Sequence, residues 1–154
     1  MCERMRPESS SLPNTMADTA TAMTDTAPGN KRAILHICTR ETLRPLRDRV
    51  LTLSGFHVDS TLTHTEALSM FWARHYDLVL IDVEGETGIP QAEQLCSEIK
   101  TAQPGQLVAF VCNWRVAIMT DCPDEIVRTE FDPAAFAQGV RDIVPSNDLA
   151  EKLQ

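Results

Sequence analysis

The feature that most constrains the fold is an apolar run that ends in a carboxylate, Asp77-Leu-Val-Leu-Ile-Asp82. A strand that is apolar at nearly every position is buried on both faces, which is typical of a central strand in a parallel sheet. After Asp82 the chain enters a polar, glycine-containing run at positions 84–88. Because active groups in open parallel sheets gather at the carboxyl ends of the strands, Asp82 stands where a functional carboxylate is expected.

The size and charge of the chain narrow the class of protein. A chain of 154 residues predicts one domain, and a net charge of −8 argues against a general nucleic-acid binder, which carries a basic patch. No apolar run approaches the roughly 18 residues of a membrane span, and no apolar stretch follows Arg4 and Arg6 as in a secretory signal. We therefore predict a cytoplasmic protein that contacts neither nucleic acid nor membrane.

The composition changes at about residue 30. Residues 1–30 contain one leucine and no isoleucine, valine or aromatic residue, so this segment cannot bury enough apolar surface to fold. We predict a disordered N-terminal tail over 1–30, a folded domain over 31–145 and a short C-terminal tail over 146–154.

Strand and helix patterns alternate within the predicted domain. Apolar runs predict strands at 33–38, 56–59, 77–82, 107–112 and 125–129. Helices are predicted by the spacing of Leu43, Leu46, Val50 and Leu53, by a capping box that begins at Thr63, and by the Asp132-Pro133 pair. This alternation predicts an α/β fold, a doubly wound (βα)5 domain with a five-stranded parallel sheet in the order 2-1-3-4-5. Little chain separates the last two strands, so the fourth helix is expected to be short or absent.

Several motifs together resemble the receiver domain of bacterial response regulators, a flavodoxin-like fold. The similarity covers about residues 31–145 and depends on these stretches: 32–37, 55–58, 65–68, 76–82 and 131–133. The resemblance implies that Asp82 accepts a phosphoryl group from a histidine kinase in a two-component system.

Other positions depart from the pattern that the resemblance implies. Receiver domains hold Mg²⁺ with two acidic residues after the first strand, where this chain has Cys38 and Thr39. The hydroxyl residue that ends the fourth strand is replaced by Cys112, and the lysine that ends the fifth is replaced by Thr129. The site therefore predicts a degenerate receiver with no metal ligand set and no cation facing Asp82, because Mg²⁺ requires several oxygen ligands.

We accordingly expect a stand-alone pseudo-receiver that acts through protein contacts, without enzymatic turnover and without a cofactor. One alternative is a working response regulator that is phosphorylated on Asp82 with Mg²⁺, with Glu41, Glu84 or Glu86 as a substitute ligand. A second alternative is a small-molecule or redox-responsive module of the same fold, although no glycine-rich phosphate loop follows the first strand.

The expected partner is a histidine kinase or another signalling protein, or a second copy of the chain. No output module is recognisable in the sequence, so a signal would leave through such a contact. The predicted contact surface covers roughly residues 114–144, which include the fifth strand and the last helix, with these residues as candidates: Trp114, Arg115, Arg128 and Phe131.

Three residue types invite a functional interpretation that we weigh against a structural one. The five cysteines show no zinc spacing and predict reduced thiols, with Cys96 on a helix and Cys122 in a loop. The default interpretation is that the cysteines are small apolar residues of the core. A metal or redox site built from Cys38, Asp82 and Cys112 is the alternative. His36 is expected to be a hydrogen-bonded core histidine. Arg40, Arg44 and Arg47 share one side of a helix and are expected to form a solvated stripe.

Overall fold

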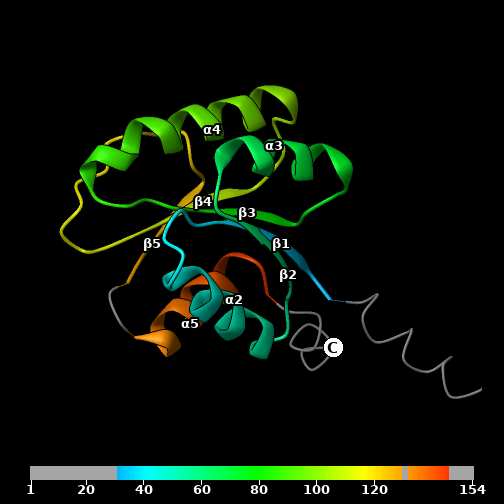
Figure 1. Ribbon diagram of the computed structural model, residues 1–154, viewed down its shortest axis with the longest axis vertical. Helices are drawn as coiled ribbons and strands as arrows, with labels where there is room; N and C mark the ends of the chain where they lie inside the picture. The colour runs from blue at the N-terminus through cyan, green and yellow to red at the C-terminus, as the bar shows by residue number, and fades with distance from the viewer. Residues whose placement is uncertain (1–30, 130–131, 146–154) are drawn as a thin grey trace, which may run out of the picture. The chain divides into compact units, whose positions relative to one another are not determined.

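The computed structural model describes residues 31–129 and 132–145, which form a parallel five-stranded sheet between two layers of helices (Figure 1). The strand order is β2-β1-β3-β4-β5, as the sequence predicts. The strands are β1 (Ala33–Ile37), β2 (His57–Thr61), β3 (Leu78–Asp82), β4 (Val108–Cys112) and β5 (Glu125–Arg128). The predicted tails at 1–30 and 146–154 lie outside the described residues.

The strand register places Asp82 in the middle of the carboxyl edge of the sheet. Ile81 lies beside Ile37 of β1, and Asp82 lies beside Val111 of β4. All five residues of β1, β3 and β4 are buried, whereas β2 and β5 lie at the edges of the sheet and are partly exposed. The central apolar strands therefore position the carboxylate between two neighbours.

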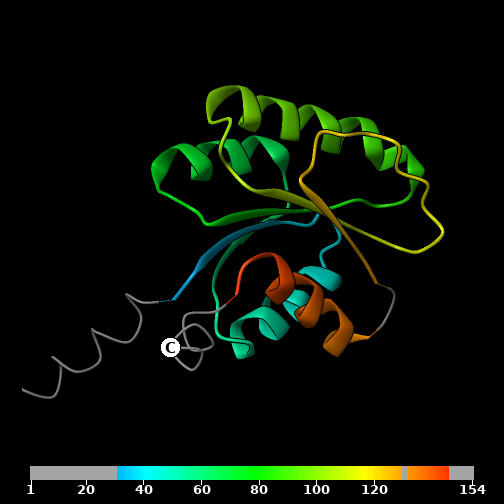
Figure 2. The ribbon, with the colours of Figure 1, turned by 180° about the vertical axis from the view of Figure 1, so that it is seen from behind.

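Helices cover both faces of the sheet (Figures 1 and 2). One layer holds α2 (Leu43–Leu53) and α5 (Pro133–Ile143), and the other holds α3 (His64–Ala73) and α4 (Ile89–Ala102), which the short 3-10 helix Glu86–Gly88 precedes. Each face has its own apolar core, because successive residues of a strand point to opposite faces. No helix within the described ranges is long and apolar enough to cross a membrane.

The predicted helix starts are present as hydrogen-bonded caps. The Thr63 hydroxyl accepts a hydrogen bond from the backbone N–H of Glu66 at 3.1 Å, which starts α3. Asp132 accepts from the N–H groups of Ala134 and Ala135, and Pro133 follows in the first turn of α5.

The connection from β4 to β5, residues 113–124, contains no helix. The prediction of a short or absent helix at this place is therefore confirmed. The Arg128 guanidinium donates hydrogen bonds to the carbonyls of Asn113 at 3.2 Å and Val116 at 2.8 Å. A side chain from β5 thus holds part of the irregular segment in place.

Two of the four apolar residues that predict α2 are exposed, and the other two, Leu43 and Val50, are only partly buried. Leu46 is 63% exposed and Leu53 is 75% exposed, whereas the buried residues of this helix are Arg47 and Leu51. A buried arginine is uncommon unless it is paired. Its partner identifies the candidate site.

Candidate functional site

Asp82 is buried at the carboxyl end of β3, and both of its carboxylate oxygens are paired with guanidinium groups. Arg40 Nη2 donates to Oδ1 at 2.8 Å, and Arg47 Nη1 donates to Oδ2. The side chain of Asp82 is 2% exposed, compared with 9% for Arg47 and 39% for Arg40. The carboxylate is therefore neutralised by two positive charges from the chain itself.

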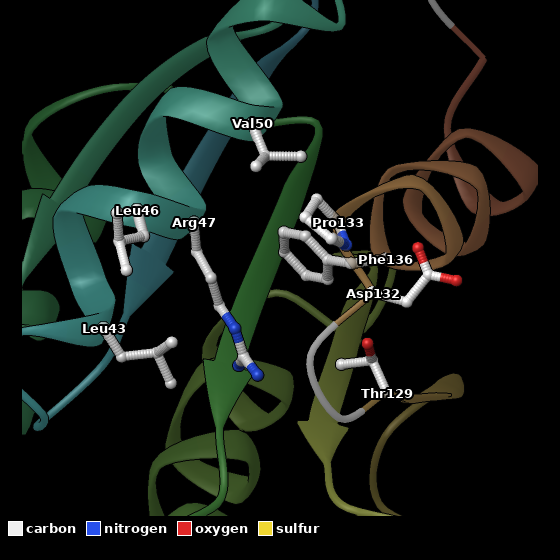
Figure 3. A pocket seen from close by; sticks show the side chains of 8 residues that line it. All are labelled: Leu43, Leu46, Arg47, Val50, Thr129, Asp132, Pro133 and Phe136. Atoms are coloured by element: carbon white, nitrogen blue, oxygen red, sulfur yellow. The ribbon is translucent and has the colours of Figure 1, made fainter.

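Arg47 reaches Asp82 from the middle of α2 and passes beside α5. Its guanidinium lies 5.2 Å from the centroid of the Phe136 ring, and Figure 3 shows the Arg47 side chain extending past that ring. Burial lowers the pKa of Arg47 to about 10, so the group remains protonated at neutral pH. Arg47 therefore brings a positive charge to Asp82 at neutral pH.

Two predictions about this region are wrong. The three arginines do not form a solvated stripe, because Arg40 and Arg47 bind Asp82 while Arg44 donates to Ser60 at 2.8 Å and to Asp48 at 3.3 Å. The expectation that no cation faces Asp82 also fails. Periodicity placed the arginines on one side of the helix correctly, but it could not show that this side faces a buried carboxylate.

A second buried polar group lies next to the ion pair. His36 Nδ1 lies 2.7 Å from Asp48 Oδ1, and Asp48 also accepts a hydrogen bond from Ser60 at 2.5 Å. Burial lowers the pKa of His36, which favours the neutral imidazole with its proton on Nδ1, since the carboxylate can only accept. The other ring nitrogen, Nε2, is buried and has no hydrogen-bond partner in the described part of the chain. The prediction of a core histidine is confirmed, with one nitrogen left unpaired.

Ligand atoms of His36, Cys38 and Asp82 lie within 4.8 Å of one another, and within the described ranges this is the one group of three metal-ligating side chains. A nitrogen, a sulfur and a single carboxylate do not suit Mg²⁺, which prefers an octahedron of oxygens. The carboxylate also already carries two guanidinium groups, whose charge opposes a cation. The residues present therefore do not fit the magnesium ion that receiver domains bind.

The predicted grouping of Cys38, Asp82 and Cys112 is wrong, because His36 takes the place of Cys112. Asp82 lies beside Val111, and the next residue of a strand points to the opposite face of the sheet. Cys112 accordingly packs in the core beneath α3 and α4, where burial raises its pKa. Cys38 Sγ lies 3.6 Å from Asp82 Oδ2.

The remaining site candidates lie around the same edge of the sheet. The Thr39 hydroxyl donates to Glu84 at 3.2 Å on the surface, and Thr129 is buried. The glutamates proposed as substitute ligands do not join Asp82 in a group of three ligating side chains among the described residues. Thr129 also lines an apolar pocket of about 140 Å³ between α2 and α5 (Figure 3), together with the following residues: Leu43, Leu46, Arg47, Val50, Asp132, Pro133 and Phe136.

The predicted contact residues differ in how far they are exposed to a partner. Trp114 is 65% exposed and Arg115 is exposed, as a contact surface requires. Arg128 is half-buried and is occupied by the carbonyls of the connection that follows β4. Phe131 lies outside the described residues.

Comparison with known proteins shows which solved structures share this fold. No family model matches the chain, and no curated protein matches it. Among solved structures, the response regulator TrrA from Thermotoga maritima, in complex with Mg²⁺–BeF, superposes with a TM-score of 0.62 at 23% identity. That match covers 73% of this chain and 99% of TrrA.

Two further solved structures give the same result. A complex of the histidine kinase ThkA with TrrA matches at a TM-score of 0.62 and 22% identity, covering 73% of this chain and 98% of the matched chain. A response regulator receiver domain from Clostridium thermocellum matches at 0.61 and 18%, covering 80% and 99%. The five-stranded parallel sheet and these likenesses show the CheY-like, flavodoxin-like receiver fold.

Proposed function

We propose that this chain, which has the fold of response-regulator receiver domains, is a pseudo-receiver that signals through protein contacts without efficient magnesium-dependent phosphorylation of Asp82. The observation that carries the proposal is the pairing of both Asp82 oxygens with Arg40 and Arg47. The chain would act in the cytoplasm as a component of two-component or phosphorelay signalling, without catalytic turnover of its own.

The chemistry of phosphoryl transfer supports this proposal. An acceptor carboxylate must offer a free oxygen as the nucleophile, and a divalent ion neutralises the charge of the phosphoryl group. Here Oδ2 is held by the buried guanidinium of Arg47, so attack by this oxygen would require breaking a buried ion pair, and attack by Oδ1 would require displacing Arg40. The neighbouring thiol and imidazole do not supply the oxygen ligands that magnesium needs.

A working phosphoacceptor is the second candidate, and one observation favours it. Guanidinium groups bind phosphate oxygens well, and the Arg40 side chain is 39% exposed, so it has room to move with an incoming group. In this case Arg40 and Arg47 would supply the positive charge that a metal ion and a lysine supply in the receiver pattern. The two candidates differ in whether Asp82 gains a phosphoryl group.

A protein partner is the remaining part of the proposal. TrrA is found in complex with a histidine kinase, which supports a kinase or a related signalling protein as the partner of a chain with this fold. The exposed Trp114 and Arg115 are the contact residues that we propose for it. The net charge of −8 supports a protein partner over nucleic acid.

The deciding experiment treats the full-length chain with acetyl phosphate and Mg²⁺ and measures intact mass. A receiver domain with both acidic residues serves as the positive control in the same reaction, and Asp82→Asn is the matched variant. We expect the positive control to gain one phosphoryl mass and this chain to gain none. A phosphoryl adduct on the natural chain that Asp82→Asn removes would establish the second candidate instead.

A further inference from the structure

Two cysteines that are distant in the sequence meet on the opposite side of the sheet from Arg47. Cys96 lies in α4, Cys122 lies in the connection between β4 and β5, and their sulfur atoms are 2.7 Å apart. Both are free thiols in the structure. A disulfide bond requires about 2.0 Å between the sulfurs, so a small movement brings this pair to bonding distance.

The surrounding contacts hold the two sulfurs together without a bond between them. Lys100 lies one helical turn after Cys96 on the same face of α4, and its ammonium group contacts Asp124 at 2.5 Å. Asp124 also accepts a hydrogen bond from the backbone N–H of Val108 at 2.9 Å, which fixes it to the start of β4. In both views the connection passes alongside α4 (Figures 1 and 2). The ion pair with Lys100 and the hydrogen bond to Val108 therefore keep the chain beside Cys122 close to α4, and so keep the two thiols near each other.

We propose that Cys96 and Cys122 form a reversible intramolecular disulfide, which makes this pair an oxidation site independent of Asp82. The two thiols differ in access, as a stepwise oxidation requires: Cys122 is half-buried, whereas Cys96 is fully buried. Cys38 and Cys112 are also buried, but among the described residues the hydrogen bonds of their thiols lead to no second cysteine. In a reducing compartment, a disulfide of this kind is formed and reduced as conditions change.

The oxidant that we assign is a small-molecule disulfide such as oxidised glutathione. The thiolate of Cys122 attacks one glutathione sulfur, the glutathione S–S bond breaks, and one glutathione leaves as a thiolate. The sulfur of Cys96 then loses its proton, attacks the Cys122 sulfur and displaces the second glutathione. Two protein thiols are oxidised, one glutathione disulfide is reduced to two thiols, and these receive the two protons.

The order of these steps follows from burial. Burial raises the pKa of Cys96, so this thiol is a poor first nucleophile, and the half-buried Cys122 reacts first. Once Cys122 carries glutathione, the nearby Cys96 attacks within the same molecule, and this proximity compensates for its weak ionisation.

The test uses the full-length chain in glutathione buffers from fully reduced to fully oxidised, followed by alkylation, intact mass and peptide mapping. We expect oxidation to remove two hydrogen masses and to join the peptides of Cys96 and Cys122. The other cysteines should remain open to alkylation after unfolding. Cys122→Ser should abolish the bond, and Cys112→Ser, which removes a buried thiol outside the pair, should leave it intact.

Three results would overturn the proposal: Cys122 held only as a glutathione adduct, a bond between two chains, or both thiols still free in the fully oxidised buffer. Because Cys96 is buried, Cys96→Ser is informative only where circular dichroism shows a folded chain. Cys122→Ser, at the more exposed position, decides the question in either case.

Discussion

Replacement of Arg47 by methionine tests the central ion pair most directly. Methionine keeps much of the apolar stem beside Phe136 and removes the charge that faces Asp82. Removing one partner of a buried ion pair costs about 3–5 kcal/mol, because the other charge is left buried without compensation. Arg40 still holds Oδ1, so we expect the lower end, a loss of about 3 kcal/mol in the free energy of unfolding.

Arg40→Met is the matched control for this experiment. Its side chain is 39% exposed, and solvent screens such a pair, so we expect a loss of no more than about 1 kcal/mol. Urea denaturation of Arg47→Met, Asp82→Asn and the double variant completes a double-mutant cycle. The double variant should cost clearly less than the two single changes together, because no buried charge then lacks its partner. A cost below about 1 kcal/mol for Arg47→Met, or strictly additive costs, would refute the reasoning.

Two further predictions concern stability. The pKa of buried His36 lies below its unfolded value of about 6.5, so the unfolded state binds more protons between the two values. The free energy of unfolding should therefore fall as the pH drops below about 6.5, by at most about 1.4 kcal/mol per pH unit. Urea denaturation at several pH values measures this slope. His36→Gln should flatten this part of the profile, whereas replacement of the exposed His75 by glutamine should leave it unchanged. In Gly139→Ala, the new Cβ would lie 2.8 Å from a Val127 methyl group, so we expect the free energy of unfolding to fall by about 1–2 kcal/mol. Gly105→Ala, whose new Cβ meets open space, should be nearly neutral. Equal thermal stability of the two variants would contradict this account.

The sequence predicted the parts of the fold that depend on local pattern. Apolar runs located the five strands, their alternation with helices predicted the sheet order, and Thr63 and Asp132 marked the starts of two helices. Asp82 was identified because a strand that is buried on both faces ends at a charged residue. Each of these inferences needs only neighbouring residues and general rules of parallel sheets.

The contacts of the site were not predictable by the same means. Arg47 is 35 positions from Asp82, and the leucines Leu46 and Leu53, which the apolar spacing predicted to be buried, are exposed instead. Burial of this helix is decided by the need to neutralise a carboxylate inside the protein, which periodicity does not record. Cys96 and Cys122 are likewise 26 positions apart, and no spacing rule connects them.

The hydrogen bonds of Arg128 have a consequence for how such a domain can be built. A crossover between parallel strands needs at least about a dozen residues, and it is usually helical because a helix satisfies its own backbone groups. Here one guanidinium on the edge strand satisfies carbonyls of the irregular crossover instead. Strands β4 and β5 therefore remain parallel neighbours although no helix connects them, and a side chain of the second strand secures the beginning of the segment that leads to it.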